Sequence, residues 1–377
     1  MLTFVASAFA RGMVNTVNVG TAASVASEDQ DAASRRSGRV RVGIVGATGY
    51  LGSELLRHLL QHPHARVQKL ASATSAGKSA KGRFPGFGGA LDAHTFVPMT
   101  AEALAGCDVV FLATPSGVAR ELAPSLLAAG IRVVDLSGDH RLSPGAAKKH
   151  YGAAAIAEGA VYGLPELNAS RIQRAQLVAN PGCYPTASAL ALLPLARAGL
   201  IEEPVLVTAM SGASGAGREA SDELHFPEMN ESARAYKVGT HRHEPEIAET
   251  LSYAAGSGLR VSFTPHIIPM NRGILATAHA RPKGPALEVG ELVALYEKAY
   301  ASEPFVQVVE HEPDTKHVRN TNYCHVKPHG VNSAGYYVVT SAIDNLVKGG
   351  SGQAIENMNI MFGLPRAAGL PVFGGGP

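Results

Sequence analysis

A strand-like run that leads straight into a glycine-rich turn and then into a helix constrains this chain more than any other feature. The run RVRVGIVG begins at Arg39, GATGYLG supplies glycines at a spacing of three, and the apolar-periodic segment SELLRHLLQH follows. Glycines allow the backbone to approach a pyrophosphate, and the N-terminus of the helix faces its negative charge. The pattern predicts a dinucleotide-binding turn, with a purely structural tight turn as the alternative. Its candidate cofactor contacts are Gly46, Thr48, Gly49, Tyr50, Leu51 and Gly52.

Strand and helix patterns continue to alternate after this turn. The segment CDVVFLATPSGV enters a helix that ends near Gly130, and IRVVDLSGDHRLSP supplies the next strand. Such alternation is typical of a doubly wound parallel sheet, whose ligand lies beyond the carboxyl ends of the strands. The residues at these ends are Thr114, Pro115, Ser116, Ser137 and Gly138. We expect them near a cofactor, with Ser116 as a contact, although each alone also suits a turn.

The second strand, RVQKLAS, ends at Ser72 without the Asp or Glu that an NAD-selective fold uses for the ribose hydroxyl. Hydroxyl groups and a lysine follow instead, in the sequence SATSAGK. These groups suit a 2′-phosphate, so NADP is favoured over NAD, with Ser72, Ser75 and Lys78 as contacts. Because the segment has no arginine to clamp the phosphate, a polar surface loop is the alternative.

Beyond Gly199 the pattern changes. Strand-like runs are joined by long polar loops and by two helices, Glu244–Ala255 and Val289–Ala301. The runs are Val205–Met210, Arg260–Thr264, Ile274–Arg281, Phe305–Glu310, Tyr323–Lys327 and Gly335–Ile343. This arrangement indicates an α+β domain with a mostly antiparallel sheet, and NLVKGGSGQAIENMNIMFGL predicts a closing helix opened by glycines.

One cysteine occupies a place where a helix starts. The apolar run that ends at Ala179 is followed by the turn Asn-Pro-Gly and then by Cys183, and an apolar-periodic segment begins after Pro185. Unpaired N–H groups and the positive end of a helix dipole stabilise an anion, so we expect a lowered pKa for the Cys183 thiol. The position predicts a nucleophile, with a small buried apolar side chain as the alternative.

A cysteine nucleophile requires a base, and the chain has 15 histidines. Those in polar segments are His225, His241, His243 and His266. We select His266 as the candidate base because it follows a strand and lies between prolines that fix its backbone, with Arg272 six residues later as an anion clamp. A histidine with a purely structural role is the alternative.

Composition excludes several function classes. The chain has 377 residues, 46% hydrophobic and 17% charged, with a net charge of +2 and with Lys and Arg spread along it. That balance fits two domains with real cores and gives no support to a nucleic-acid or membrane role. Three cysteines without paired spacing argue against a disulfide framework or a zinc ribbon and indicate a reducing compartment. The pairs His241-x-His243 and Cys324-His325 lack matched partners, so we expect no metal site.

The first 38 residues differ from the rest. Up to Ser27 the only charged side chain is Arg11, and the segment is rich in Ala, Ser, Thr and Val. An acid-poor start of this kind resembles an organelle transit peptide, and a disordered leader without a function is the alternative.

Nine motifs together carry a family resemblance that covers Arg39 to Leu364. They are GATGYLG, SAGK, YGLPELN, NPGCYPT, SGASGAGR, HRHEPEI, PHIIPMNRG, TNYC and DNLVKGGSGQAIENMN. NPGCYPT with PHIIPMNRG is highly specific, whereas GATGYLG is shared with many NADP enzymes. With these motifs the chain resembles the semialdehyde dehydrogenase family, in its N-acetyl-gamma-glutamyl-phosphate reductase group. Ala73 is a departure, since family members often carry an arginine beside the serine after the second strand.

The resemblance implies an α/β fold with a Rossmann-type NADP-binding domain of residues 39–182 and 344–377. Residues 183–343 would form the catalytic and oligomerisation domain of a homodimer or homotetramer. The family's nucleophile corresponds to Cys183 and its acid/base to His266, and the returning closing helix brings Asn345, Lys348 and Gly349 near the nicotinamide. An acyl phosphate with a second carboxylate needs cationic and N–H donors. The candidates are Arg141, Ser211, Arg218, His241, Arg242, Arg272, Arg319 and Gln353.

The implied reaction is the NADPH-dependent reduction of N-acetyl-gamma-glutamyl phosphate to the 5-semialdehyde, through a thioester on Cys183, in arginine synthesis. An aspartate-semialdehyde dehydrogenase with the same thiol chemistry and a non-catalytic NADP-binding regulator are the alternatives. Arginine synthesis in a chain with such a leader favours the plastid stroma, with the mitochondrial matrix or the cytoplasm as alternatives.

Overall fold

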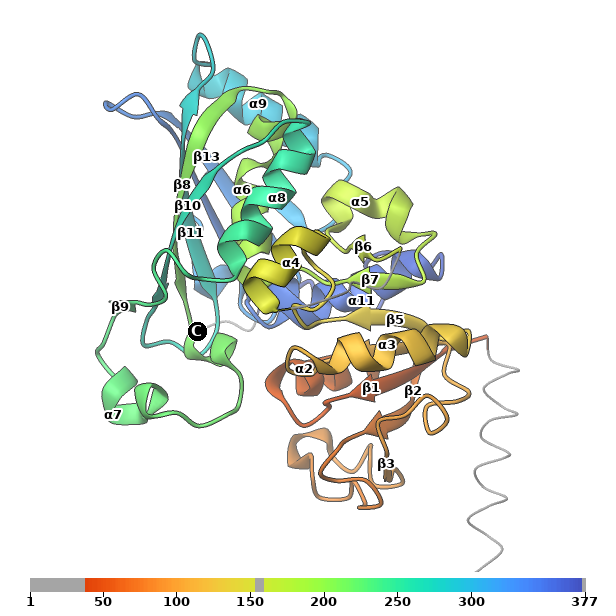
Figure 1. Cartoon of the computed structure of the whole chain (residues 1–377). Helices are drawn as coiled ribbons and strands as arrows, with labels where there is room; N and C mark the ends of the chain where they lie inside the picture. The colour runs from red at the N-terminus through yellow and green to blue at the C-terminus, as the bar shows by residue number, and fades with distance from the viewer. Residues whose placement is uncertain (1–37, 153–158, 375–377) are drawn as a thin grey trace, which may run out of the picture. The chain divides into compact units, whose positions relative to one another are not determined.

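A seven-stranded parallel sheet forms the framework of the first half of the molecule (Figure 1). The computed structural model describes residues 38–152 and 159–374, so the predicted leader lies outside the described residues except for Gly38. The strand order is β3-β2-β1-β4-β5-β7-β6, and each pairing is parallel. The strands are β1 (Val40–Val45), β2 (Ala65–Ala71), β3 (Phe96–Val97), β4 (Val109–Leu112), β5 (Arg132–Asp135), β6 (Val161–Tyr162) and β7 (Leu177–Ala179). This is the doubly wound order expected of a Rossmann-type domain.

Helices pack on this sheet through apolar faces, which are formed by side chains at helical spacing. On the first helix Leu55, Leu56 and Leu59 are buried in one cluster with Val42 and Ile44 of β1. The helices of this half are α2 (Tyr50–Leu59), the 3₁₀ turn η1 (Pro85–Phe87), α3 (Val118–Ala128), α4 (Pro144–Tyr151), α5 (Pro165–Ile172) and α11 (Gly352–Met361). The last of these packs in the same cluster, so the chain returns to the first sheet at its end.

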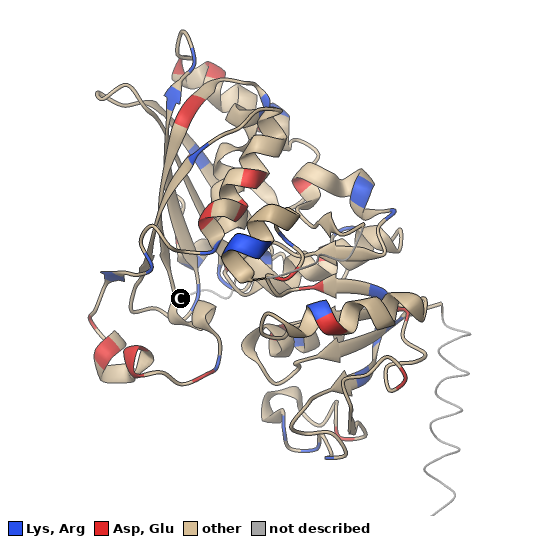
Figure 2. Ribbon diagram, viewed as in Figure 1, with Lys and Arg blue, Asp and Glu red and all other residues tan. Residues whose placement is uncertain are grey.

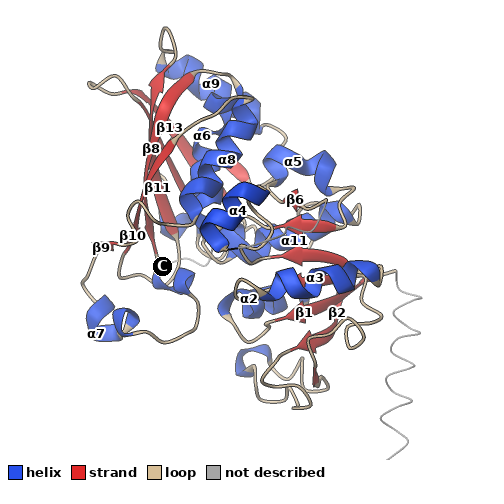
Figure 3. Ribbon diagram, in the orientation of Figure 1, coloured by secondary structure: helices blue, strands red, loops and turns tan. Residues whose placement is uncertain are grey.

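A second seven-stranded sheet, with the order β12-β13-β14-β11-β8-β10-β9, is antiparallel in four of its six pairings. Its strands are β8 (Ile201–Ser211), β9 (Arg234–Ala235), β10 (Val261–Ile267), β11 (Ile274–Pro282), β12 (Val306–Val308), β13 (Cys324–Val331) and β14 (Tyr337–Ile343). Its helical elements are α6 (Cys183–Arg197), η2 (Ala213–Ala216), η3 (Asp222–Leu224), α7 (Phe226–Met229), α8 (His243–Ala255), α9 (Val289–Tyr300) and α10 (Thr315–Val318). Figure 3 shows α6, α8 and α9 on the same side of the sheet. The predicted fold class, a Rossmann-type domain with a mostly antiparallel second sheet, is confirmed.

Two helix starts differ in detail from the sequence patterns. Helix α6 begins at Cys183 itself, two residues before Pro185, so the cysteine is the first helical residue. The closing segment begins with a π-helical turn, Val347–Ser351, before it continues as α11. Gly349 and Gly350 lie in this turn, and a β-carbon on Gly349 would lie 2.8 Å from the Cys183 β-carbon. The glycines therefore allow this turn to pack directly against the start of α6.

Charged residues are not concentrated on any one helix or strand. Figure 2 shows Lys and Arg dispersed along the ribbon and interspersed with Asp and Glu. Among the described residues, no helix has both the length and the apolar character that crossing a membrane requires.

Candidate active site

A cavity of about 850 Å³ follows the carboxyl ends of the parallel strands and reaches Cys183. Its volume is within the range of ligand pockets, and its place is the one that a doubly wound sheet provides for a cofactor. One wall comes from the first sheet and from the turn before α11, and includes Gly49, Tyr50, Leu51, Thr114, Pro115, Ser116, Gly138, Asn180, Asn345 and Gly349. The other wall comes from the loops after β8 and before α8, and includes Ser211, Ser214, Arg218, Tyr236, His241 and His243.

The glycine turn gives the cavity a free helix N-terminus. Gly46 has φ +85°, and a β-carbon on it would lie 2.3 Å from the Ala113 carbonyl oxygen. A β-carbon on Gly52 would lie 2.2 Å from the Gly46 carbonyl oxygen, so α2 packs this close only because both residues are glycine. Gly49 precedes α2 without a side-chain cap, which leaves the first N–H groups of the helix for a ligand. The arrangement fits the pyrophosphate of a dinucleotide.

A buried carboxylate, Glu246, and a partly buried guanidinium, Arg141, hold the turn that carries Cys183. Glu246 of α8 is 1% exposed and accepts hydrogen bonds from the Gly182 N–H, at 2.8 Å, and from the Tyr162 hydroxyl, at 2.9 Å. Arg141 donates from Nε to the Asn180 carbonyl and from Nη2 to the Leu136 carbonyl, both at 2.8 Å. The carboxyl end of β7 and the start of α6 are therefore fixed to α8 and to the loop after β5.

The thiol of Cys183 is protonated in the resting protein. Burial raises its pKa to about 11, although the Tyr184 N–H and the Arg141 charge act in the opposite direction. The prediction of a lowered pKa is wrong, because the position at the start of α6 does not compensate for the loss of solvation. Attack by this thiol therefore requires a base within reach.

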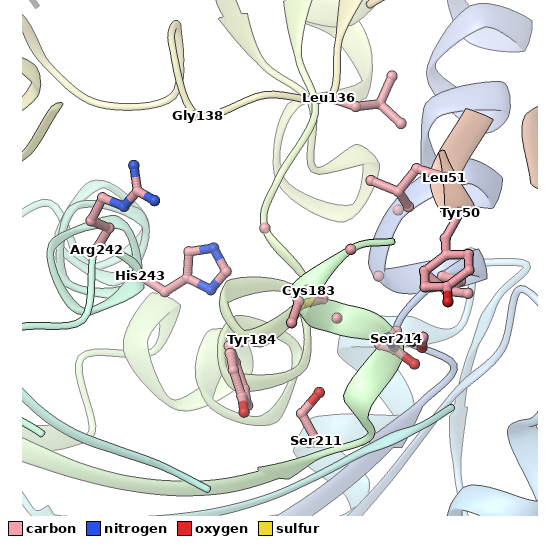
Figure 4. A pocket seen from close by; sticks show the side chains of 18 of the residues that line it. Tyr50, Leu51, Leu136, Gly138, Cys183, Tyr184, Ser211, Ser214, Arg242 and His243 are labelled. Carbon is pink, nitrogen blue, oxygen red and sulfur yellow. Dashed lines mark hydrogen bonds between the residues drawn. The ribbon is translucent and has the colours of Figure 1, made fainter. Parts of the chain in front are cut away.

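The His243 imidazole faces the turn that precedes Cys183. A β-carbon on Gly182 would lie 2.6 Å from His243 Nε2 and 2.9 Å from Arg141 Nη1, so both groups face the residue that precedes Cys183. Figure 4 shows the His243 ring pointing toward Cys183. Burial, together with the neighbouring His241 imidazole and Arg141 guanidinium, lowers the pKa of His243 well below its usual value. A neutral imidazole beside a protonated thiol is arranged to accept the thiol proton.

Aromatic rings pack around this histidine. The His241 ring lies 4.8 Å from that of His243 and 5.6 Å from that of Tyr184, measured between centroids. The Tyr236 hydroxyl donates to the Tyr184 hydroxyl at 3.2 Å. Burial, with Lys237 and Arg242 nearby, lowers the pKa of His241 to about 4. His241 is therefore a neutral polar wall of the cavity at physiological pH.

The structure does not bring the His266 side chain into this cavity. Phe263, Pro265 and Ile267 of β10 are buried, and alternation along a strand places His266 on the opposite face. Its carbonyl oxygen accepts a hydrogen bond from the Tyr184 hydroxyl at 2.9 Å, so its backbone contacts a residue of the site. The predicted base His266 therefore does not line the cavity, whereas His241 and His243 do. The HRHEPEI segment contains the pattern that could have indicated His243: this second histidine is the first residue of a helix, and the buried acid Glu246 follows it in the same turn.

The remaining candidates divide into two groups. Those that line the cavity are Gly49, Tyr50, Leu51, Ser116, Arg141, Ser211, Arg218, His241, Arg242, Asn345 and Gly349. Those that lie outside its lining are Gly46, Thr48, Gly52, Ser72, Ser75, Lys78, Arg272, Arg319, Lys348 and Gln353. Ser72, Ser75 and Lys78 follow the carboxyl end of β2, and the Lys78 ammonium, 3.4 Å from the Thr74 carbonyl, is exposed.

Three of the predicted contacts have structural roles instead. Lys348 is fully buried, and its ammonium lies 2.6 Å from a Glu166 carboxylate oxygen and 3.0 Å from one of Glu356. Arg272 pairs with Glu54 at 2.8 Å and with Asp344 at 3.0 Å. Gln353 donates to the Thr186 hydroxyl at 3.0 Å. These side chains therefore make contacts inside the protein, and none of the three lines the cavity.

Sequence comparisons identify the class of protein that this fold and site define. Residues 41–175 match the family model described as the semialdehyde dehydrogenase NAD binding domain. Residues 183–345 match the model described as the semialdehyde dehydrogenase dimerisation domain. Among solved structures, the chain is similar to aspartate semialdehyde dehydrogenase II from Vibrio cholerae, with a TM-score of 0.67 and 15% identity over 86% of this chain and 98% of that one. At this identity the similarity shows the fold.

Curated relatives narrow the class. The N-acetyl-gamma-glutamyl-phosphate reductase of Brevibacillus brevis is 46% identical over 342 residues, with 88% of this chain and 98% of the relative covered. The enzyme of the same name from Pseudomonas aeruginosa is 48% identical over 339 residues, with the same coverage of both chains. The chain therefore belongs to the N-acetyl-gamma-glutamyl-phosphate reductase group of the semialdehyde dehydrogenase family.

The pKa of Cys183 predicts how alkylation depends on pH. Because that pKa is about 11, the thiolate fraction, and with it the rate of reaction with iodoacetamide, should rise about tenfold per pH unit between roughly pH 7 and 10. Peptide mapping by mass spectrometry measures the rate at each cysteine, and the buried Cys107 and Cys324 should react more slowly. A rate at Cys183 that is already constant above pH 7 would contradict the raised pKa.

Proposed function

We propose that this protein catalyses the NADPH-dependent reduction of N-acetyl-gamma-glutamyl phosphate to N-acetylglutamate 5-semialdehyde and phosphate, a step of arginine synthesis. The observation that carries the proposal is the position of Cys183. The thiol opens α6 inside a cavity that extends to the glycine turn, and it lies beside a neutral imidazole. A thiol so placed can form a thioester, which accepts hydride where a carboxylate does not.

The residues of the chain account for the proton transfers. His243 takes the thiol proton as Cys183 attacks the acyl carbonyl, and phosphate leaves as the thioester forms. The N–H groups at the start of α6 are positioned to stabilise the oxyanion. When bound, NADPH supplies the hydride to the thioester carbon. The resulting hemithioacetal then expels the Cys183 thiolate, which recovers its proton from His243 as the semialdehyde is released.

Cationic groups around the cavity fit an acyl phosphate that carries a second carboxylate. Arg141, Arg218, Lys237 and Arg242 line it. The acid Glu246 raises the pKa of Arg141 against the opposing effect of burial, so its guanidinium keeps its charge. Arg218 donates to the Thr48 carbonyl at 3.0 Å, which places a cation between the glycine turn and the loop after β8. We assign the phosphate and carboxylate of the substrate to these groups.

Substitution of each histidine tests the choice of base. His243→Asn should lower kcat by about 10²–10⁴-fold, because the neutral imidazole is needed in the transition state. His266→Asn should leave kcat within about threefold of the wild type, since its side chain lies outside the cavity lining. Cys183→Ser should abolish turnover while NADPH binding, measured by fluorescence titration, persists. A large loss of kcat in the His266 variant with normal turnover in the His243 variant would reverse the assignment.

The substrate is tested in the reverse direction. With phosphate and NADP⁺ present, the protein should oxidise N-acetylglutamate semialdehyde and reject aspartate semialdehyde. The second aldehyde is a methylene shorter and carries an ammonium, which would remain unpaired beside Arg141 and the other cations. Arsenate should replace phosphate, because the thioester requires only a tetrahedral oxyanion. A preference for aspartate semialdehyde would favour the rival dehydrogenase, and oxidation without either anion would exclude an acyl-phosphate step.

We also expect a preference for NADPH over NADH. The second strand ends without an acid, and the exposed Lys78 follows it on the edge where a 2′-phosphate would lie. Lys78→Glu should therefore raise the KM for NADPH about tenfold or more through repulsion, and Lys81→Glu, an exposed lysine three residues later, serves as the matched control. Equal turnover of NADH and NADPH by the wild type would contradict this interpretation.

A homodimer or homotetramer is the assembly we propose. The second half matches a dimerisation domain. On β8 the apolar side chains of Leu206 and Met210 are 39% and 40% exposed, on the face opposite the buried Val207 and Ala209. An exposed apolar sheet face of this kind favours self-association. Light scattering should give a mass of two or four times 39.1 kDa, and a monomer at micromolar concentration would refute the proposal.

We propose that the first 38 residues direct the protein to an organelle, and that this organelle is the plastid, with the stroma as the final compartment. The acid-poor, Ser- and Ala-rich composition supports this, whereas the bacterial origin of the relatives weighs against it. Fusion of residues 1–38 to a fluorescent protein in plant cells tests the proposal. Fluorescence outside plastids would redirect it to the mitochondrial matrix or the cytoplasm.

A further inference from the structure

Three histidines that the proposed reaction does not use meet beside the second sheet. We propose that His311, His317 and His325 form a binding site for a divalent transition metal, with Zn²⁺ as the natural occupant. One ring nitrogen of each histidine lies within 4.8 Å of those of the other two. The His311 ring lies 5.2 Å from that of His317 and 5.4 Å from that of His325, measured between centroids.

Each histidine comes from a different element. His311 follows β12, His317 belongs to the short helix α10, and His325 is the second residue of β13. Cys324 and Val326 pack in the core of the second half, so alternation along the strand directs His325 to the other face. The fold thus brings together three side chains that lie at most 14 positions apart in sequence, from His311 to His325.

The buried histidine has a nitrogen that lacks a partner. His325 is 7% exposed, and its Nδ1 is buried without a hydrogen bond. A buried polar atom without a partner is costly, and such an atom in a native protein often binds a water or an ion. A metal bound between the three rings would provide the missing partner.

The chemistry of the donors suits zinc. Imidazole nitrogens are among the donors that Zn²⁺ binds most often in proteins. Three histidines with an open fourth position are an established zinc ligand set, in which the donor nitrogens lie ~3.3 Å apart. The rings would have to approach by about 1.5 Å from their present spacing. His311 and His317 are exposed, so rotation of their side chains can supply that movement.

A metal at this place would brace the wall of the cavity. The Thr315 hydroxyl of α10 lies 3.9 Å from the Met270 sulfur, and a β-carbon on Gly273 would lie 2.7 Å from the Thr315 β-carbon. The Met270 carbonyl in turn accepts the Ala213 N–H in the loop after β8. Fixing α10 to β13 would therefore restrain the segment on which the cavity loop rests. The role is structural, because the site is built from elements that do not line the cavity.

Calorimetric titration of the untagged full-length protein with Zn²⁺, after treatment with a chelator, tests the proposal. The wild type should bind one Zn²⁺ per chain at this site, and His311→Gln or His317→Gln should weaken binding about tenfold or more. Both residues are exposed, so these variants should remain folded, which circular dichroism checks. His225→Gln, which removes an exposed histidine outside the cluster, is the matched control and should bind as the wild type does.

Co²⁺ as a spectroscopic probe separates this site from Cys183 and its neighbouring histidines. Bound Co²⁺ should show no thiolate charge-transfer band, and the Cys183→Ser variant should give the same titration as the wild type. Zn²⁺ should also slow hydrogen exchange in residues 311–325. The proposal is overturned if the wild type binds no Zn²⁺, if both glutamine variants bind it as the wild type does, or if binding is lost in Cys183→Ser.

Discussion

The hydrogen bond from the Gly182 N–H to the buried carboxylate of Glu246 is the contact on which the site depends. It joins the residue before the nucleophile to the helix that begins with His243, so thiol and imidazole are positioned by one interaction. Tyr162 donates to the same carboxylate oxygen. Arg141 Nη1 lies 3.5 Å from the other oxygen, Oε2, and compensates the charge of the carboxylate. A buried carboxylate is stable only with such partners. Loss of any of these partners would leave the Glu246 carboxylate less well compensated and would weaken its hold on the turn at Gly182.

Burial also decides the protonation states with which the reaction starts. The rise in the pKa of Cys183 from an ordinary 9.0 to about 11 corresponds to ~3 kcal/mol by which the free protein disfavours the thiolate. The same desolvation disfavours an imidazolium at His243. A neutral pair is therefore favoured over an ion pair in the free protein. In the proposed reaction, an oxyanion held by the N–H groups of α6 would offset this cost as charge develops.

The sequence predicted the parts of the site that follow from local pattern. The glycine turn before α2 and the cysteine at the start of α6 are each defined by a few consecutive residues, because a strand end, a turn and a helix start are local events. The base was not predictable in this way. His266 and His243 both lie in polar segments, and only the pairing of β10 within the sheet, with the packing of Phe263 inward, decides which imidazole faces the thiol. The buried ion pair of Lys348 was not predictable for a related reason, since Glu166 lies 182 residues away in sequence.

Long-range ion pairs connect the cofactor side of the cavity to its substrate side. Arg272, in the loop before β11, reaches Glu54 of α2 and Asp344 after β14. Burial alone would raise the pKa of Glu54, but its hydrogen bonds with His58 and Arg272 hold it well below its usual value, so the carboxylate stays charged. Asp344 also accepts the N–H groups of Leu346 and Val347 and thereby fixes the π-helical turn against Cys183. Helix α2, which follows the glycine turn, and the π-helical turn, which packs against Cys183, are therefore joined by one ion-pair network. The proposed hydride transfer needs a rigid frame of this kind, since a displacement of about 1 Å at the reacting atoms can cost a hundredfold in rate.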